Sequence, residues 1–145
     1  MMTRDRILAL DLGEKRVGLA LSDPLGFTAQ PLPYLPFSGL DRLIHDLDGV
    51  IREKSVSAVL IGLAKNPDGS EGPRAAESRK AGEKIEKACR VPVRYIDETF
   101  TSRDAEEFLI RELDVPRKKR REIRDSLSAC LILRSYIEAH ERSGT

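Results

Sequence analysis

The sequence has few cysteines, no tryptophan and no apolar run long enough to cross a membrane. Its two cysteines, Cys89 and Cys130, lie among apolar residues at helical spacing, which is typical of small buried side chains in a reducing compartment and gives no zinc-binding spacing. Charged residues at positions 4–6 precede only a short apolar strand, so no signal peptide is indicated. We therefore expect one cytoplasmic domain over residues 1–145, large enough to fold without covalent staples.

The sequence also has little net charge and few aromatic residues. It contains 25 Lys and Arg against 24 Asp and Glu, for a formal net charge of +1, and its aromatic content is 5%. This balance argues against a surface coated everywhere by nucleic acid, although a local basic patch is compatible with it. An extended array of stacking aromatics is excluded, so base-by-base reading of a nucleic acid is not expected.

Apolar patterning along the chain alternates between strand and helix. Apolar runs predict five strands, near residues 7–11, 17–22, 27–35, 56–63 and 91–98. Helical spacing predicts four helices, over 38–54, 74–90, about 101–116 and from between 118 and 125 to about 140. Pro31 and Pro33 confine the third strand to a sheet edge, and Ser38 with Asp41 resembles a capping box. This order predicts an α/β fold with a mixed sheet, in which three N-terminal antiparallel strands precede parallel strands and helices cover both faces.

An ionisable residue stands at the end of the first strand. Asp11 follows the apolar run 7–10 and precedes a turn at Gly13. Buried carboxylates persist when they are paired with cations, hydrogen-bonded or bound to metal. Alternatively, Asp11 shapes the turn by accepting backbone N–H groups. Lys15 and Arg16 follow in the same turn and are candidate phosphate contacts.

Two further carboxylates are expected near Asp11. Asp97 and Glu98 end the last strand, and right-handed crossovers bring them to the same sheet edge as Asp11. Asp125, at the start of the final helix, can close the group. Three such oxygen ligands suit Mg²⁺ or Mn²⁺, and two such ions can promote phosphodiester cleavage. Alternatively, Glu98 supports the following helix start, and Asp125 caps its own helix or pairs with Arg124.

A basic run directly precedes Asp125. Over eight positions it has six basic residues and one acidic residue, and the basic ones are Arg117, Lys118, Lys119, Arg120, Arg121 and Arg124. Such a cluster beside a metal site would neutralise nucleic-acid phosphates, and Arg103, after Glu98, is a further candidate. The alternative is a solvated basic turn.

Four motifs in this order resemble the YqgF (RuvX) type of bacterial Holliday junction resolvase, also described as a nuclease that matures the small-subunit ribosomal RNA precursor. The motifs occupy residues 11–23, 62–72, 97–102 and 125–136. The resemblance implies a ribonuclease H-like fold and metal-dependent phosphodiester hydrolysis, with Asp11, Glu98 and Asp125 at the acidic positions. The sequence departs from the family at Thr99, where arginine is common, and at Ala64, where proline is common.

These features favour a nuclease dependent on Mg²⁺ or Mn²⁺ that acts on structured nucleic acid. The resemblance leaves two substrates open: the 5′ end of the pre-16S rRNA in ribosome biogenesis, which we favour and which makes ribosomal particles expected partners, and a branched DNA junction in recombination. A third interpretation is a non-catalytic module that binds RNA or ribosomes. A fourth takes the Asp-x-Gly turn as the phosphate loop of an actin-like ATPase, but such enzymes need a second lobe for which 145 residues leave no room.

Overall fold

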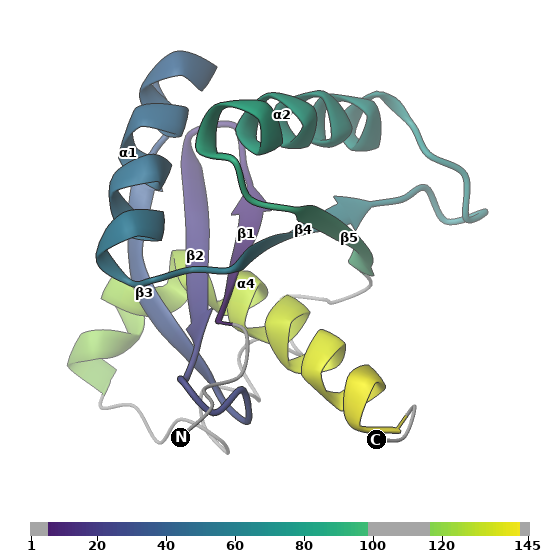
Figure 1. Ribbon diagram of the computed structural model, residues 1–145. Coiled ribbons are helices and arrows are strands. Elements are labelled where there is room, and N and C mark those ends of the chain that lie inside the picture. Colours follow the sequence, from purple (N-terminus) through teal and green to yellow (C-terminus); the bar gives the residue numbers. More distant parts are fainter. Residues whose placement is uncertain (1–5, 99–116, 143–145) are drawn as a thin grey trace.

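The computed structural model describes residues 6–98 and 117–142, and it describes the side chains of residues 6–98 and 126–139 (Figure 1). The strands are β1 (Ile7–Leu12), β2 (Arg16–Ser22), β3 (Ala29–Pro36), β4 (Ala58–Ala64) and β5 (Val93–Glu98). The helices are α1 (Leu40–Glu53), α2 (Pro73–Cys89) and α4 (Arg117–Arg142). The helix predicted over 101–116 falls outside the described residues.

The five strands form one mixed sheet in the order β3-β2-β1-β4-β5. β1 pairs antiparallel with β2 and β2 with β3, whereas β4 runs parallel to both β1 and β5. The predicted mixed sheet is confirmed, and β3 lies at an edge as Pro31 and Pro33 require. β5 ends at Glu98, as predicted, and the pairing of Ala64 with Glu98 places the carboxyl end of β5 level with that of β4.

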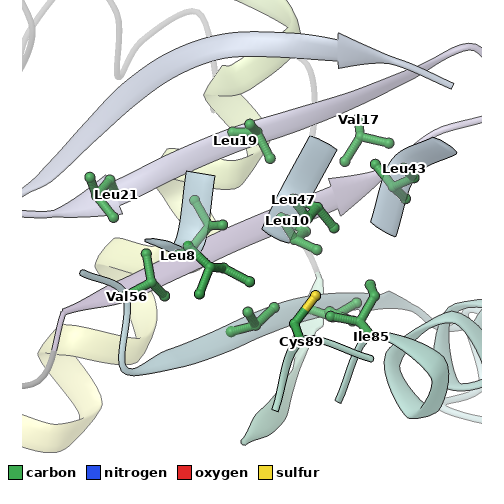
Figure 2. Packing of buried hydrophobic residues seen from close by; sticks show 13 residues of the cluster. Leu8, Leu10, Val17, Leu19, Leu21, Leu43, Leu47, Val56, Ile85 and Cys89 are labelled. Atoms are coloured by element: carbon green, nitrogen blue, oxygen red, sulfur yellow. The ribbon is translucent and has the colours of Figure 1, made fainter. Parts of the chain in front are cut away.

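Side chains alternate along β1 between two apolar layers on opposite faces of the sheet. Leu8 and Leu10 pack toward α1 and α2 in a cluster that Figure 2 shows from close by. Ile7 and Ala9 pack toward α4 on the other face. Helices therefore cover both faces, as predicted, and the same alternation places Asp11 on the α4 face. Burying each large apolar side chain contributes about 1.5–3 kcal/mol, so these layers fix the frame on which the polar residues sit.

The start of α1 differs from the prediction. Gly39, not Ser38, is the N-cap residue, and no side chain caps the helix. Gly39 has φ +114°, a conformation that glycine adopts without strain, so the chain enters the helix through a backbone turn and the predicted capping box is wrong. Asp41 still places a negative charge in the first turn, where the helix dipole favours it.

The last helix is longer than predicted, because residue 117 is already helical and the helix continues to residue 142. Its middle is buried: Cys130, Ile132 and Leu133 are fully covered against the sheet. Cys89 and Cys130 are both free and buried, which confirms the sequence prediction. Among the described residues, no helix combines the length and apolar character needed to cross a membrane.

Candidate active site

A buried serine fastens α4 to the sheet. The Ser126 hydroxyl donates a hydrogen bond to the Leu32 carbonyl oxygen at 2.6 Å and accepts one from the Leu19 N–H at 3.2 Å. The β2–β3 register shifts between Val17 and Leu19, and the serine hydroxyl bonds to one backbone group on each of these strands. A buried backbone group left unpaired costs about 1–3 kcal/mol, so this pair of bonds fixes where α4 lies.

Asp11 lies at the carboxyl end of β1 on the face that α4 covers. Ser128, two residues after the fastening serine, hydrogen-bonds the Asp11 carboxylate, and Glu98 adjoins it. Burial raises the pKa of Asp11 because it disfavours the charged form, while the positive charge of Arg74 and the Ser128 hydrogen bond act against that rise. At the end of β1, the Asp11 carboxylate thus interacts with α4 and with Glu98.

Glu98 lies at the carboxyl end of β5, on the same face as Asp11. Its pKa is raised to about 7, first by burial and second by the negative charge of Asp11, while Arg74 opposes the rise. Two carboxyl groups from strands on either side of β4 therefore share one partly buried site. The sequence prediction that Asp11 and Glu98 converge is confirmed in the structure.

A glycine in β4 makes room for this convergence. Gly62 lies between the two acidic strands, and a Cβ at this position would overlap the Ile132 side chain and lie 3.4 Å from the Glu98 carboxylate oxygen Oε2. Without that Cβ, α4 approaches the sheet closely and the Glu98 carboxylate occupies the space. The sequence pattern places Gly62 near the end of a predicted strand and gives it no partner, because Ile132 is 70 positions away.

Arg74 supplies the positive charge that acts on both carboxylates. It lies in the first turn of α2 and is exposed to solvent. Sequence reasoning assigned Arg74 to a helix and gave it no role in the site. Its position in sequence could have indicated this role. Arg74 directly follows the polar loop at the carboxyl end of β4, and loops at this end of a parallel strand line the ligand site.

That loop is closed on itself. The Asn66 N–H donates to the Ser70 carbonyl at 2.9 Å, and the Ser70 N–H donates to Asp68 Oδ1 at 2.9 Å. Lys65, at its base, forms an ion pair with Asp97, with 3.0 Å between Nζ and Oδ1. Because side chains alternate along β5, Asp97 faces away from Glu98, and its ion pair ties the loop to the end of the sheet.

Lys15 and Arg16 are exposed at the turn between β1 and β2, next to Asp11 in sequence. The Gly13 N–H donates to the Arg16 carbonyl at 3.0 Å, which closes this turn. The Arg16 guanidinium lies over the Tyr34 ring, with Cζ 5.2 Å from its centroid. These two cations are therefore at the same end of β1 as the carboxylates.

Other predicted site residues fall outside the described side chains: Asp125, Arg103, Arg117, Lys118, Lys119, Arg120, Arg121 and Arg124, together with Thr99. Among the side chains that the structure does describe, no group of three or more His, Cys, Asp or Glu is placed to hold a metal ion. Asp11 and Glu98 are two carboxylates of the predicted three. The backbone of residue 125 is helical and precedes Ser128 by three positions, about one turn of α4.

Comparisons with known proteins place the chain in a family. It is 43% identical over 143 residues to a protein of Oenococcus oeni, covering 94% of this chain and 96% of the relative, whose name describes a pre-16S rRNA nuclease. It is 41% identical over 141 residues to a protein of the same name from Streptococcus equi subsp. equi, covering 93% and 99%. T. thermophilus RuvC in complex with a Holliday junction substrate matches with TM-score 0.61 at 13% identity, covering 98% of this chain and 99% of RuvC, so the two share the ribonuclease H-like fold. The family model described as "RuvX: Holliday junction resolvase" matches residues 5–139, and the chain belongs to this family.

Proposed function

We propose that this protein is a nuclease that depends on a divalent metal and hydrolyses phosphodiester bonds of structured nucleic acid, with the 5′ end of the pre-16S rRNA as its favoured substrate. The observation that carries the proposal is the partly buried pair of Asp11 and Glu98, whose pKa values are both raised. Two like charges in a desolvated site are unfavourable alone, and such pairs are typical of functional sites. The names of the relatives support the choice of rRNA.

The residues of the site fit Mg²⁺ or Mn²⁺. Carboxylate oxygens are the ligands that these ions prefer, and a divalent cation would relieve both the desolvation and the mutual repulsion of Asp11 and Glu98. Asp125 is the proposed third ligand, because position 125 lies about one helical turn before Ser128, which bonds to Asp11. When bound, the ion supplies Lewis-acid polarisation of the phosphate and activation of a water molecule.

The chain's own residues position the substrate and the ligands. Ser128 orients the Asp11 carboxylate, as hydrogen bonds from outside the ligand set commonly do at metal sites. Arg74 neutralises part of the negative charge that a phosphate brings to the carboxylates, and Lys15 and Arg16 contact flanking phosphates. We propose that the basic residues at 117–121 and Arg124, at the start of α4, also bind phosphates of the nucleic acid. Such contacts would make the affinity for nucleic acid fall with added salt.

The test is cleavage of a pre-16S rRNA fragment by Asp11→Asn and Glu98→Gln variants, with Mg²⁺, with Mn²⁺ and with chelator. We expect each variant to lose about a hundredfold or more in cleavage rate while its RNA affinity in chelator stays within about twofold. Asp97→Asn is the matched control. It also replaces a carboxylate by an amide, next to Glu98 in sequence, but in a side chain that pairs with Lys65. Unchanged cleavage in both site variants would contradict the assignment.

A branched DNA junction is the second candidate substrate. It is favoured by the description of the family model and by the shared fold with RuvC, which was solved with a Holliday junction. Assaying a four-way DNA junction beside the rRNA fragment under the same conditions decides between the two. Salt-sensitive RNA binding that ignores chelator, with no cleavage of either substrate, would instead favour a non-catalytic binding module.

A further inference from the structure

A tyrosine and an arginine form a cation–π pair near the edge of the sheet. The Arg16 Cζ lies 5.2 Å from the centroid of the Tyr34 ring. Val17 and Leu35, which follow these residues in sequence, pack in the cluster beneath α1 and α2. Because side chains alternate along a strand, Arg16 and Tyr34 lie on the opposite face, which also carries Asp11.

The pair lies two strands away from Asp11 on the same face of the sheet. Asp11 pairs with Gly18 of β2, and β3 is the next strand beyond β2. Two strand spacings separate β1 from β3 by about 10 Å, a distance that a few nucleotides of one strand can cover. The Phe37 N–H donates to the Lys15 carbonyl at 2.8 Å, which ties the end of β3 to the turn beside Asp11.

The backbone around Tyr34 is stiff, and its ring is accessible. Pro33 and Pro36 flank the segment, and each fixes its own φ and restricts the residue before it. Tyr34 is 37% exposed, as is Phe37 just after the strand. Because Pro31 and Pro33 remove two N–H groups from this edge, it is poorly suited to pairing with a further strand. A ring held this way loses little conformational freedom when a ligand stacks on it.

We propose that Tyr34, held by Arg16, is a stacking platform for an unpaired base of the substrate strand next to the cleavage site. The proposal rests on the proposed nuclease function and narrows its substrate class to nucleic acids with single-stranded nucleotides beside the scissile phosphate. An aromatic face accepts any base, and an adjacent guanidinium both stacks and neutralises phosphate. A single aromatic ring can bind an unpaired base without specificity for which base it is. Such a role needs only one aromatic residue, which agrees with the low aromatic content of the chain.

The test measures binding in chelator, with Asp11→Asn in every protein so that cleavage plays no part. The probe is an RNA hairpin with a single-stranded flank, compared with the same hairpin whose flank is paired to a complementary strand. We expect Tyr34→Leu to weaken binding of the flanked hairpin by about fivefold to hundredfold and to leave the fully paired form unchanged. Tyr34→Phe keeps the ring and should bind like the parent protein.

Two further readouts keep the test decisive. Phe27→Leu removes an aromatic that is 53% exposed at the turn between β2 and β3, at the other end of both strands, and should alter neither affinity. With 5-iodouracil in the flank, irradiation should cross-link the RNA to Tyr34. Equal losses for both hairpins, an equal loss in Tyr34→Phe, or cross-links confined to other residues would overturn the platform.

The same probes made of DNA show whether the platform prefers RNA or DNA strands.

A failure of the nuclease proposal is separate from a failure of the platform, because binding in chelator does not require that Asp11 or Glu98 promotes cleavage. If Asp11→Asn still cleaves RNA, the metal site is wrong and the stacking measurement stands. If Tyr34→Leu leaves affinity for the flanked hairpin unchanged, the platform is wrong while the metal site is unaffected.

Discussion

The two faces of the sheet are built by different kinds of contact. The face under α1 and α2 is filled by interlocking aliphatic side chains, among them Leu8, Leu10 and Leu47 (Figure 2). The α4 face has its own apolar layer, but there α4 is also tied down by the Ser126 hydroxyl, and the layer ends at Asp11 and Glu98. Apolar contacts are non-directional, whereas hydrogen bonds fix position within tenths of an ångström.

This difference separates the residues that stabilise the fold from those that form the candidate site. Substitutions on the α1 and α2 face should reduce the amount of folded protein and leave the geometry of the site intact. Substitutions on the α4 face should disturb the site in molecules that remain folded. Three measurements would strengthen or break this comparison between the two faces.

The largest effect is expected for Leu47→Ala on the α1 and α2 face. Leu47 is fully buried, and removing its side chain leaves a cavity that lowers the free energy of unfolding by about 2–5 kcal/mol. Urea denaturation measures this loss. Because Leu47 packs in the cluster opposite Asp11, the cleavage rate per folded molecule should stay within about twofold of the wild type. A large loss of activity per folded molecule would show that the two faces are coupled.

The next effect is expected for Gly62→Ala on the α4 face. The new Cβ would overlap Ile132 and approach Glu98, so overpacking should lower the free energy of unfolding by about 1–3 kcal/mol and displace the carboxylate from its place beside Asp11. Cleavage per folded molecule should fall at least about tenfold, in contrast to Leu47→Ala.

Gly49→Ala is the matched control for Gly62→Ala. Gly49 lies in α1 with no atom within 4 Å of the added Cβ, so this change should stabilise the protein by about 0.5–1 kcal/mol and leave cleavage unchanged. If folded Gly62→Ala protein cleaves at the wild-type rate, the space left by the missing Cβ of Gly62 does not matter for the site.

The same contrast explains which parts of the site could be predicted from sequence. The strands, the edge position of β3 and the convergence of Asp11 with Glu98 follow from apolar periodicity and from crossover rules, which depend on neighbouring residues and on strand ends. The role of Ser126 does not follow from its neighbours in sequence. Its partners, Leu19 and Leu32, lie 107 and 94 positions away, beside the register shift between β2 and β3.

Arg74 and Gly62 were missed for a related reason. A residue at a helix start and a glycine near a strand end each have a sufficient local explanation, so a single sequence does not reveal their distant partners. The roles of Asp125 and of the basic run ahead of it remain predictions. Tyr34 shows the reverse case, because a low aromatic count excludes an array but says nothing about one ring placed beside a cation.

The smallest effect is a dependence of stability on pH that arises on the α4 face. In the folded protein the pKa of Glu98 is about 7, against an ordinary value of 4.5, and the pKa of Asp11 is also raised. The folded state therefore binds a proton that the unfolded state releases between about pH 4.5 and 7, and the free energy of unfolding falls as pH rises through this window. Because Glu98 is partly exposed and solvent screens its interactions, the fall should be at most about 2 kcal/mol.

Urea denaturation between pH 5 and 8 in chelator measures this fall. It should be smaller in Glu98→Gln, which keeps the size of the side chain and removes its charge, and it should persist in Asp97→Asn, whose carboxylate points to the other face. Adding Mg²⁺ or Mn²⁺ should remove most of the fall, since the ion binds the deprotonated carboxylates and offsets their repulsion. An equal fall in wild type and Glu98→Gln would place its source outside this carboxylate pair and contradict the assignment to the α4 face.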